Sequence, residues 1–173
     1  NPLCDGAALE ALKLISKWLK VAFDQPENIN ARGGMLIGSC LAGVAFTKGL
    51  GLVHSISHMI GAEYNTQHGL TNAIILPAVM KFNLPYVGEK VGSICHAMDL
   101  KDASSDLITE EIEKILNYVD IPRSLSEIGV PLACKKRIAE KAMLDSATGT
   151  NPRVAQIEDV EKLTENSILS ARK

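Results

Sequence analysis

The stretch that decides the fold runs from residue 49 to residue 83 and reads GLGLVHSISHMIGAEYNTQHGLTNAIILPAVMKFN. It holds three of the four histidines of the chain, His54, His58 and His68. Because His54 and His58 are four residues apart, a helix places their side chains on one face, one turn from each other. Gly61 and Asn65 signal a break before His68. The spacing therefore predicts a helix that carries two imidazoles and a turn that returns a third.

Three imidazoles in this arrangement are one way to surround a metal ion. Imidazole nitrogen is a common ligand of zinc and iron, and a catalytic metal usually has about three protein ligands and one open position. The alternative is structural, because two histidines four apart on a helix are often a half-exposed or core pair. The spacing by itself leaves both interpretations open.

The residues on either side of this stretch predict further helices. Apolar residues recur at three- and four-residue steps from Leu9 to Phe23, after Asp5 as a candidate N-cap and before Pro26. A second helix begins near Asn30 and is rich in glycine and other small residues. Because the G-x-G-x-x-G arrangement after a strand is absent, these glycines indicate close helix packing rather than cofactor binding.

The rest of the chain continues the helical pattern. Expected helices span approximately 70–83, with Pro77 inside, then 87–98, 105–119, 133–144 and 157–169. His96, on the second of these, is expected at the surface. No alternation typical of strands is present. We expect residues 1–173 to form one all-α domain, a helical bundle of about eight helices.

Composition excludes several classes of function. Hydrophobic residues make up 46% of the 173 residues, charged residues 22%, and the formal net charge is −2. This gives no electrostatic reason to expect a nucleic-acid partner or an anionic membrane. The longest apolar run, Met35–Phe46, is too short for a bilayer. The four cysteines form no C-x-x-C motif, so reduced thiols and a cytoplasmic location are expected.

The histidine stretch resembles the C-terminal signature of iron-containing (group III) alcohol dehydrogenases, approximately G-x-x-H-x-x-x-H-x-x-G followed by P-H-G-x-x-x-A. The resemblance extends to NPLCDGAALEAL at the start, AGVAF at 42–46 and TNPR at 150–153. Gln67 stands where the family usually has proline, which is expected to loosen the turn before His68. The matching residues are Gly51, His54, His58, Gly61, His68, Gly69 and Ala73.

The resemblance implies a role for each histidine. It makes His54 and His68 metal ligands and places His58 toward substrate and nicotinamide, as a catalytic proton relay or substrate contact. It implies Fe²⁺, or else Zn²⁺ or another divalent metal, together with NAD or NADP in the parent enzyme. The implied reaction is hydride transfer between a small alcohol or aldehyde and the nicotinamide, in an enzyme that is a homo-oligomer at full length.

Two parts of the resembled enzymes have no counterpart in this sequence. The N-terminal α/β dinucleotide-binding domain is absent, and no aspartate is followed four residues later by histidine, as in the family's D-x-x-x-H ligand segment. We therefore expect a C-terminal fragment with an incomplete metal site, inactive when alone, with D-x-x-x-H encoded shortly before Asn1.

Three alternatives stay open at this point. The chain could be a helical scaffold or oligomerisation module that has lost catalysis. It could also belong with relatives that use another divalent metal, such as glycerol dehydrogenase or dehydroquinate synthase. The segment Thr150–Arg153 either lines the substrate pocket or forms a structural turn.

Overall fold

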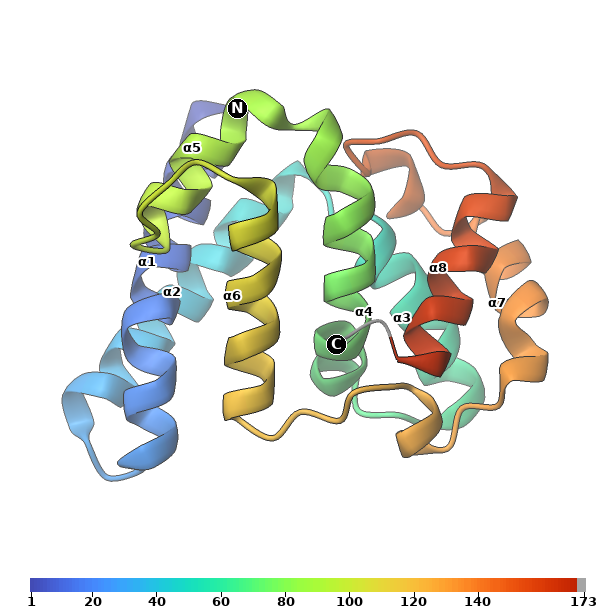
Figure 1. Ribbon diagram of the computed structural model, residues 1–173, viewed down its shortest axis with the longest axis horizontal. Helices are drawn as coiled ribbons and strands as arrows, with labels where there is room; N and C mark the ends of the chain where they lie inside the picture. The colour runs from blue at the N-terminus through green and yellow to red at the C-terminus, as the bar shows by residue number, and fades with distance from the viewer. Residues whose placement is uncertain (171–173) are drawn as a thin grey trace. The chain divides into compact units, whose positions relative to one another are not determined.

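The computed structural model describes residues 1–170, which are all-α, with no strand in that range. The expected all-α architecture of about eight helices is confirmed (Figure 1). Helices α1 to α8 span Pro2–Asp24, Ile29–Ala45, Leu52–Tyr64, His68–Asn83, Gly88–Ala97, Ser105–Tyr118, Lys135–Ala142 and Ile157–Leu169. Five short 3₁₀ segments join them: Phe46–Lys48, Leu84–Tyr86, Ser126–Ile128, Leu132–Cys134 and Thr148–Thr150.

The contacts within the chain group it into two compact units. Unit 1 comprises Asn1–Gly49 and Val87–Val119, and therefore contains α1, α2, α5 and α6. Unit 2 comprises Leu50–Tyr86 and the chain from Asp120 onward, with α3, α4, α7 and α8. Three of the four histidines, including both proposed ligands, lie in unit 2.

Small residues let α1 and α2 of unit 1 pack closely side by side (Figure 1). A Cβ atom added to Gly34 would lie 2.2 Å from Cδ1 of Trp18, and one added to Gly38 would lie 3.0 Å from Cγ1 of Ile15. The predicted close packing is thus confirmed at these two glycines. At Gly33, by contrast, an added Cβ would meet no atom within 4 Å.

The start of α1 differs from the sequence-based expectation. Asn1, rather than Asp5, is the N-cap, and its side chain accepts a hydrogen bond from the backbone N–H of Leu3. Asp5 lies in the first turn and pairs with Lys48 at 2.9 Å and with Lys90 at 2.6 Å. Because the Asp5 carboxylate pairs with two lysines outside α1, it does not cap the N-terminus of α1.

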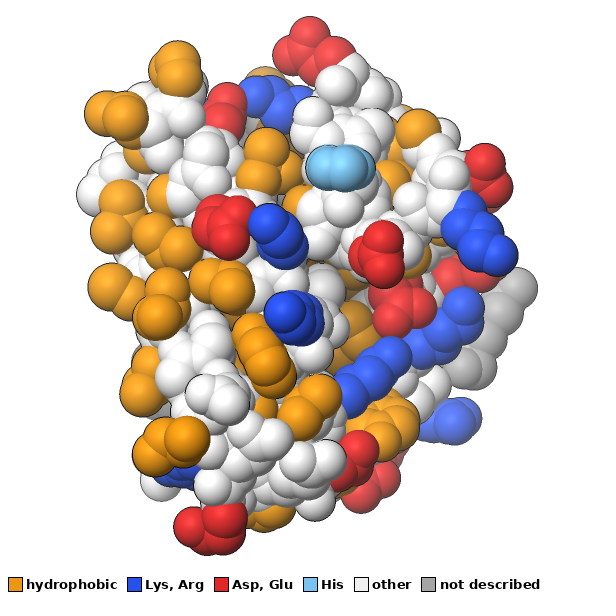
Figure 2. Space-filling view, turned by 90° about the vertical axis from the view of Figure 1, so that its left-hand side faces the viewer, with side chains coloured by type: hydrophobic (Ala, Val, Ile, Leu, Met, Phe, Trp, Pro, Cys, Tyr) orange, Lys and Arg blue, Asp and Glu red, His pale blue; other side chains and the backbone are white. Residues whose placement is uncertain are grey.

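Helix α2 and the 3₁₀ turn after it expose many apolar side chains, which contribute to the hydrophobic surface in Figure 2. The helical stretch Ile29–Lys48 is long and apolar enough to cross a membrane by length and composition alone. The apolar run 35–46 is by itself too short for a bilayer, but the helical stretch also includes the residues on either side of that run. The exposed apolar residues here are Ile29, Leu36, Ile37, Val44 and Phe46.

Unit 2 is built on a dense aliphatic core. Its centre includes Ile56 and Ile60 from α3, Ile75 from α4 and Ile138 from α7, all of them fully buried. Because a helix places residues four apart on one face, the residues of α3 that face this core leave a second face for the histidines. The core thus fixes α3 in rotation about its own axis.

Backbone turns define both ends of the histidine helix. Gly51, which precedes α3, has φ +85°, and Asn65, which follows it, is left-handed with φ 52°. Helix α4 begins at His68 itself, so this histidine is a first-turn residue and not part of the predicted turn. Gln67 is the N-cap of α4, and its side-chain oxygen accepts from the N–H of Leu70. The glutamine therefore stabilises the connection that we expected it to loosen.

Candidate metal centre

The three histidines of the sequence motif come together between α3 and α4. The ring centroids of His54 and His68 are 5.3 Å apart, those of His58 and His68 5.5 Å, and those of His54 and His58 5.8 Å. Two helices of one unit thus present three imidazoles in mutual contact.

The side-chain amide of Asn72 lies between two of these rings. Its Nδ2 is 3.3 Å from Nε2 of His54 and 3.1 Å from Nε2 of His68. An NH₂ group has two hydrogens to donate, so both ring nitrogens are acceptors and carry lone pairs directed at one place. The Asn72 Oδ1 atom is buried and has no hydrogen-bond partner within residues 1–170.

Ser57 fixes the orientation of the His68 ring. Its Oγ lies 3.1 Å from Nδ1 of His68, and the serine is only 1% exposed. The Asn72 amide contacts Nε2 of the same ring, so the two nitrogens of His68 have two different partners, Ser57 at Nδ1 and Asn72 at Nε2. A metal-binding histidine is commonly held in this way, through the nitrogen that does not bind the metal.

His58 has a different partner. Its Nδ1 lies 2.9 Å from Oδ2 of Asp145, while Oδ1 of the same carboxylate accepts a hydrogen bond from the N–H of Ala147 at 2.8 Å. Burial raises the pKa of Asp145, but the hydrogen bonds from Ala147 and His58 outweigh this and lower the pKa below its ordinary value. Asp145 is therefore an anion at neutral pH and orients the His58 ring.

The pKa of His54 is lowered, first by burial and then by the neighbouring His68 and His58, against an opposing effect of Asp145. The ring is therefore neutral at pH 7. A neutral imidazole is the form that binds a metal ion, because the binding nitrogen must be unprotonated.

The donors in this region fit part of a metal site. The Nε2 atoms of His54 and His68 both face the Asn72 amide nitrogen, so the two rings present their Nε2 atoms at a common place, as two ligands of one ion must. Residues 1–170 contain no group of three or more His, Cys, Asp or Glu side chains arranged to hold a metal. The residues present thus fit two positions of a coordination shell that needs about four.

The segment Thr150–Arg153 is a structural turn that connects α3 and α4. Oδ1 of Asn151 accepts from the N–H of Leu52 at 3.2 Å and from Nδ2 of Asn83 at 2.9 Å. Nδ2 of Asn151 donates to Oδ1 of Asn83 at 2.8 Å and to the carbonyl of Arg153 at 2.7 Å. One amide thereby joins the start of α3 to the end of α4.

Arg153 also holds this turn in place, through contacts with Phe82 and Tyr86. Its guanidinium lies 3.8 Å from the ring centroid of Phe82 and 4.8 Å from that of Tyr86, and it donates to the Phe82 carbonyl at 3.2 Å. The contacts of Asn151 and Arg153 favour the structural-turn alternative over the pocket-lining one.

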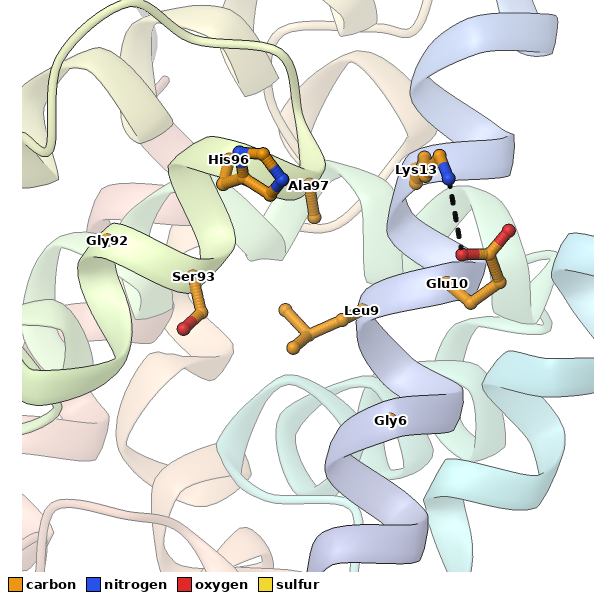
Figure 3. Close-up of a pocket in the computed structure, with 8 residues that line it drawn as sticks. All are labelled: Gly6, Leu9, Glu10, Lys13, Gly92, Ser93, His96 and Ala97. Atoms are coloured by element: carbon orange, nitrogen blue, oxygen red, sulfur yellow. Dashed lines mark ion pairs between the residues drawn. The ribbon is translucent and has the colours of Figure 1, made fainter.

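A separate depression of about 450 Å³ lies in unit 1 between α1 and α5 (Figure 3). His96, exposed as the sequence predicts, lines it together with Ser93. The ion pair that Figure 3 marks at this depression joins Lys13 and Glu10 at 3.6 Å, and the two side chains are 65% and 50% exposed. A solvated pair of neighbours on one helix is typical of an ordinary surface, so the histidine cluster of unit 2 is the stronger candidate.

Comparison with known proteins gives a consistent result. Residues 1–168 match the family model described as Fe-containing alcohol dehydrogenase family, C-terminal. The chain is 35% identical to NAD-dependent methanol dehydrogenase of Bacillus methanolicus over 176 residues, which cover 97% of this chain and 46% of the relative. It is 36% identical to lactaldehyde reductase of Escherichia coli K12 over 170 residues, 93% of this chain and 44% of the relative.

A solved structure agrees. The crystal structure of 1,3-propanediol oxidoreductase superposes with a TM-score of 0.91 and 32% identity, covering 97% of this chain and 46% of that one. The chain thus spans somewhat less than half the length of the relatives that it matches.

Proposed function

The chain belongs to the Fe-containing alcohol dehydrogenase family, and on this premise we propose that it is the metal-binding part of an enzyme that transfers hydride between a small alcohol or aldehyde and NAD(P). The relatives named above are oxidoreductases of methanol, lactaldehyde and 1,3-propanediol, which supports a small alcohol or aldehyde as the substrate class. Because the chain spans less than half of them, the activity is proposed for the whole protein.

One observation carries this proposal: Nε2 of His54 and Nε2 of His68 both lie within 3.3 Å of one atom, Nδ2 of Asn72. In the proposal these two nitrogens are metal ligands, and further donors come from other residues of the whole protein. A bound divalent ion, Fe²⁺ by the family's name, supplies Lewis acidity that lowers the pKa of an alcohol oxygen. The Ser57 hydroxyl would hold the His68 ring in the orientation that lets Nε2 bind the ion.

His58 is proposed to move the proton. With Nδ1 held by Asp145, its Nε2 is left to accept a proton when an alcohol is oxidised and to return it when an aldehyde is reduced. The Asp145 carboxylate stabilises the imidazolium that forms in the first of these steps. The His58 side chain is 36% exposed, so it can exchange protons with water.

The test compares three alanine variants of the whole protein by elemental analysis and by turnover. His54→Ala and His68→Ala are expected to lose bound metal, with activity falling in proportion. His58→Ala is expected to keep its metal and to lose roughly 10²- to 10⁴-fold in rate, the usual contribution of a positioned acid–base group. A metal-free His58→Ala beside a fully loaded His68→Ala would contradict these roles. Unchanged metal content in all three would favour a scaffold that does not use this centre.

A further inference from the structure

The contacts of Asn72 point to a function for this residue. It lies four positions after His68 on α4, so its side chain projects from the same face as the His68 ring. His54 faces it from α3. The amide therefore contacts both proposed ligands at the nitrogen atoms through which they would bind metal.

The donor pattern excludes a purely space-filling role. Each hydrogen of the Asn72 NH₂ group is donated to a different imidazole, over 3.3 Å to His54 and 3.1 Å to His68. These bonds require both rings to be neutral with the proton on Nδ1, which is the tautomer needed for binding through Nε2. For His68 the Ser57 hydroxyl contacts Nδ1 on the opposite side of the ring.

The carbonyl oxygen of the Asn72 amide lacks a hydrogen-bond partner among the described residues. Asn72 Oδ1 is buried and has no hydrogen-bond partner within residues 1–170, and a buried acceptor without a partner is destabilising. The side chain thus keeps two hydrogen bonds to the imidazoles while leaving its carbonyl oxygen unpaired. A change that turns the amide away from the rings and gives this oxygen a partner would relieve that cost.

We propose that Asn72 is the positioning residue of the histidine centre: it holds the two Nε2 lone pairs of His54 and His68 toward one point in the metal-free protein, and it yields this place when an ion binds. The amide hydrogens and an ion use the same two lone pairs, so the two cannot occupy them together. The inference rests on the proposed function, since it takes His54 and His68 as the ligands.

The first arm of the test reads the tautomers directly in the metal-free chain. Long-range ¹⁵N–¹H spectra at pH 7.5 are expected to show the proton on Nδ1 of both His54 and His68, with both Nε2 atoms as hydrogen-bond acceptors. Asn72→Leu, which is similar in size but has no donor, is expected to shift both Nε2 signals. A proton on Nε2 of either ring, or Nε2 signals that Asn72→Leu leaves unchanged, would overturn the proposal.

The second arm uses Asn72→Asp, which places a carboxylate where the amide now meets both imidazoles. Two imidazoles and one carboxylate are a three-donor set, so Co²⁺ binding, followed by its visible absorption, is expected to tighten at least tenfold over the unsubstituted chain. Asn117→Asp is the matched control, since it makes the same charge change at an exposed position on α6. Equal Co²⁺ affinity of Asn72→Asp and Asn117→Asp, with circular dichroism unchanged, would overturn the proposal.

The two proposals fail in different ways. If Asn72→Asp does not tighten Co²⁺ binding while His54→Ala and His68→Ala lose metal, the Asn72 inference is wrong and the ligand assignment stands. If the alanine variants keep their metal, the ligand assignment is wrong, whatever the tautomers of the two rings.

Discussion

The two units of this molecule are built from similar helices but use their apolar residues differently. Unit 2 buries large aliphatic side chains from four helices in one cluster and presents its polar residues around the histidines. In unit 1 the α1–α2 pair meets through small residues such as Gly34 and Gly38, and α2 leaves Leu36 and Ile37 exposed. A rigid aliphatic core is what a precise site requires, because close packing fixes each helix in rotation and height.

The difference shows which unit holds polar side chains in fixed positions. The His58–Asp145 and Ser57–His68 contacts are 2.9 Å and 3.1 Å long, and each joins two segments of unit 2. Small shifts of the backbone would break such bonds. The polar side chains around the depression of unit 1 are exposed, and the ion pair there, Lys13–Glu10, joins neighbours on one helix.

The largest effect is expected from Ile56→Ala, which removes a fully buried side chain from the core of unit 2. The cavity should lower the free energy of unfolding by about 2–5 kcal/mol. Leu36→Ala in unit 1 is the matched control, since this side chain is 73% exposed and its loss should change stability by no more than about 0.5 kcal/mol. Urea unfolding followed by circular dichroism measures both, and equal effects would remove the contrast between the units.

Next in size is Asn151→Ala, which breaks the connection between α3 and α4. The substitution leaves the Leu52 N–H and both polar atoms of the Asn83 amide without their partner. We expect a loss of about 2–3 kcal/mol, because unpaired half-buried groups each cost about 1–3 kcal/mol and solvent satisfies some of them. Asn83→Ala should cost nearly as much, and the double variant little more than either one. Additive losses in that cycle would show that the two amides act independently.

A smaller effect is expected in unit 1 from Gly34→Ala. Its new methyl group would lie 2.2 Å from Cδ1 of Trp18, so the helices must separate or the indole must move. A loss of about 1–2 kcal/mol is expected, as for other overpacked sites. Gly33→Ala, with no atom within 4 Å, should instead stabilise the helix by up to about 1 kcal/mol. Trp18 is the only tryptophan of the chain, so a shift of its fluorescence in Gly34→Ala alone would locate the clash.

The smallest effect is expected from Glu63→Gln at the surface of unit 2. Glu63 pairs with Arg137 at 2.8 Å and with Lys141 at 2.6 Å, and hydrogen bonds from Arg137 and then Lys141 lower its pKa from 4.5 to about 2. A carboxyl with a lowered pKa stabilises the fold above its unfolded pKa and loses that contribution as the pH falls. Because both cations are about half exposed, we expect about 0.5 kcal/mol at neutral pH.

The pH dependence checks the sign of that last prediction. The stability difference between the parent chain and Glu63→Gln should be constant above pH 5, shrink between pH 4.5 and pH 2, and vanish below pH 2. A difference that grows on acidification would show that the Glu63 carboxyl is not stabilised by its cations.

Much of the fold could be predicted from local sequence patterns. The last helix, Ile157–Leu169, has the predicted bounds, and α2 begins within one residue of the expected Asn30. Amphipathic spacing determines such elements, since it depends on residues within a few turns. The expected start of α4, at about residue 70, is two residues too late, because the Gln67 side chain caps the helix and places His68 inside it.

The candidate site was predictable only in part. The sequence identified His54, His58 and His68, since glycines and histidines at fixed spacing are visible without a structure. It missed Asn72, although this residue lies four positions after His68. The sequence predicts a turn at His68, and only a histidine inside a helix shares a helix face with the residue four positions later. Asp145 gave no sequence signal, as it is 87 residues from its partner His58.

The sequence by itself determined that this chain is helical, which family it belongs to and which three imidazoles it offers. Only the tertiary structure decided which nitrogen of each ring is held, and by which partner: Ser57 for His68, Asp145 for His58, and Asn72 between His54 and His68. The physical reason is that the two kinds of feature depend on different distances, one along the chain and the other in space. Helical periodicity depends on neighbours within a few turns of the chain, whereas a hydrogen bond needs two atoms within about 3 Å, and only the packed core of unit 2 brings these segments that close.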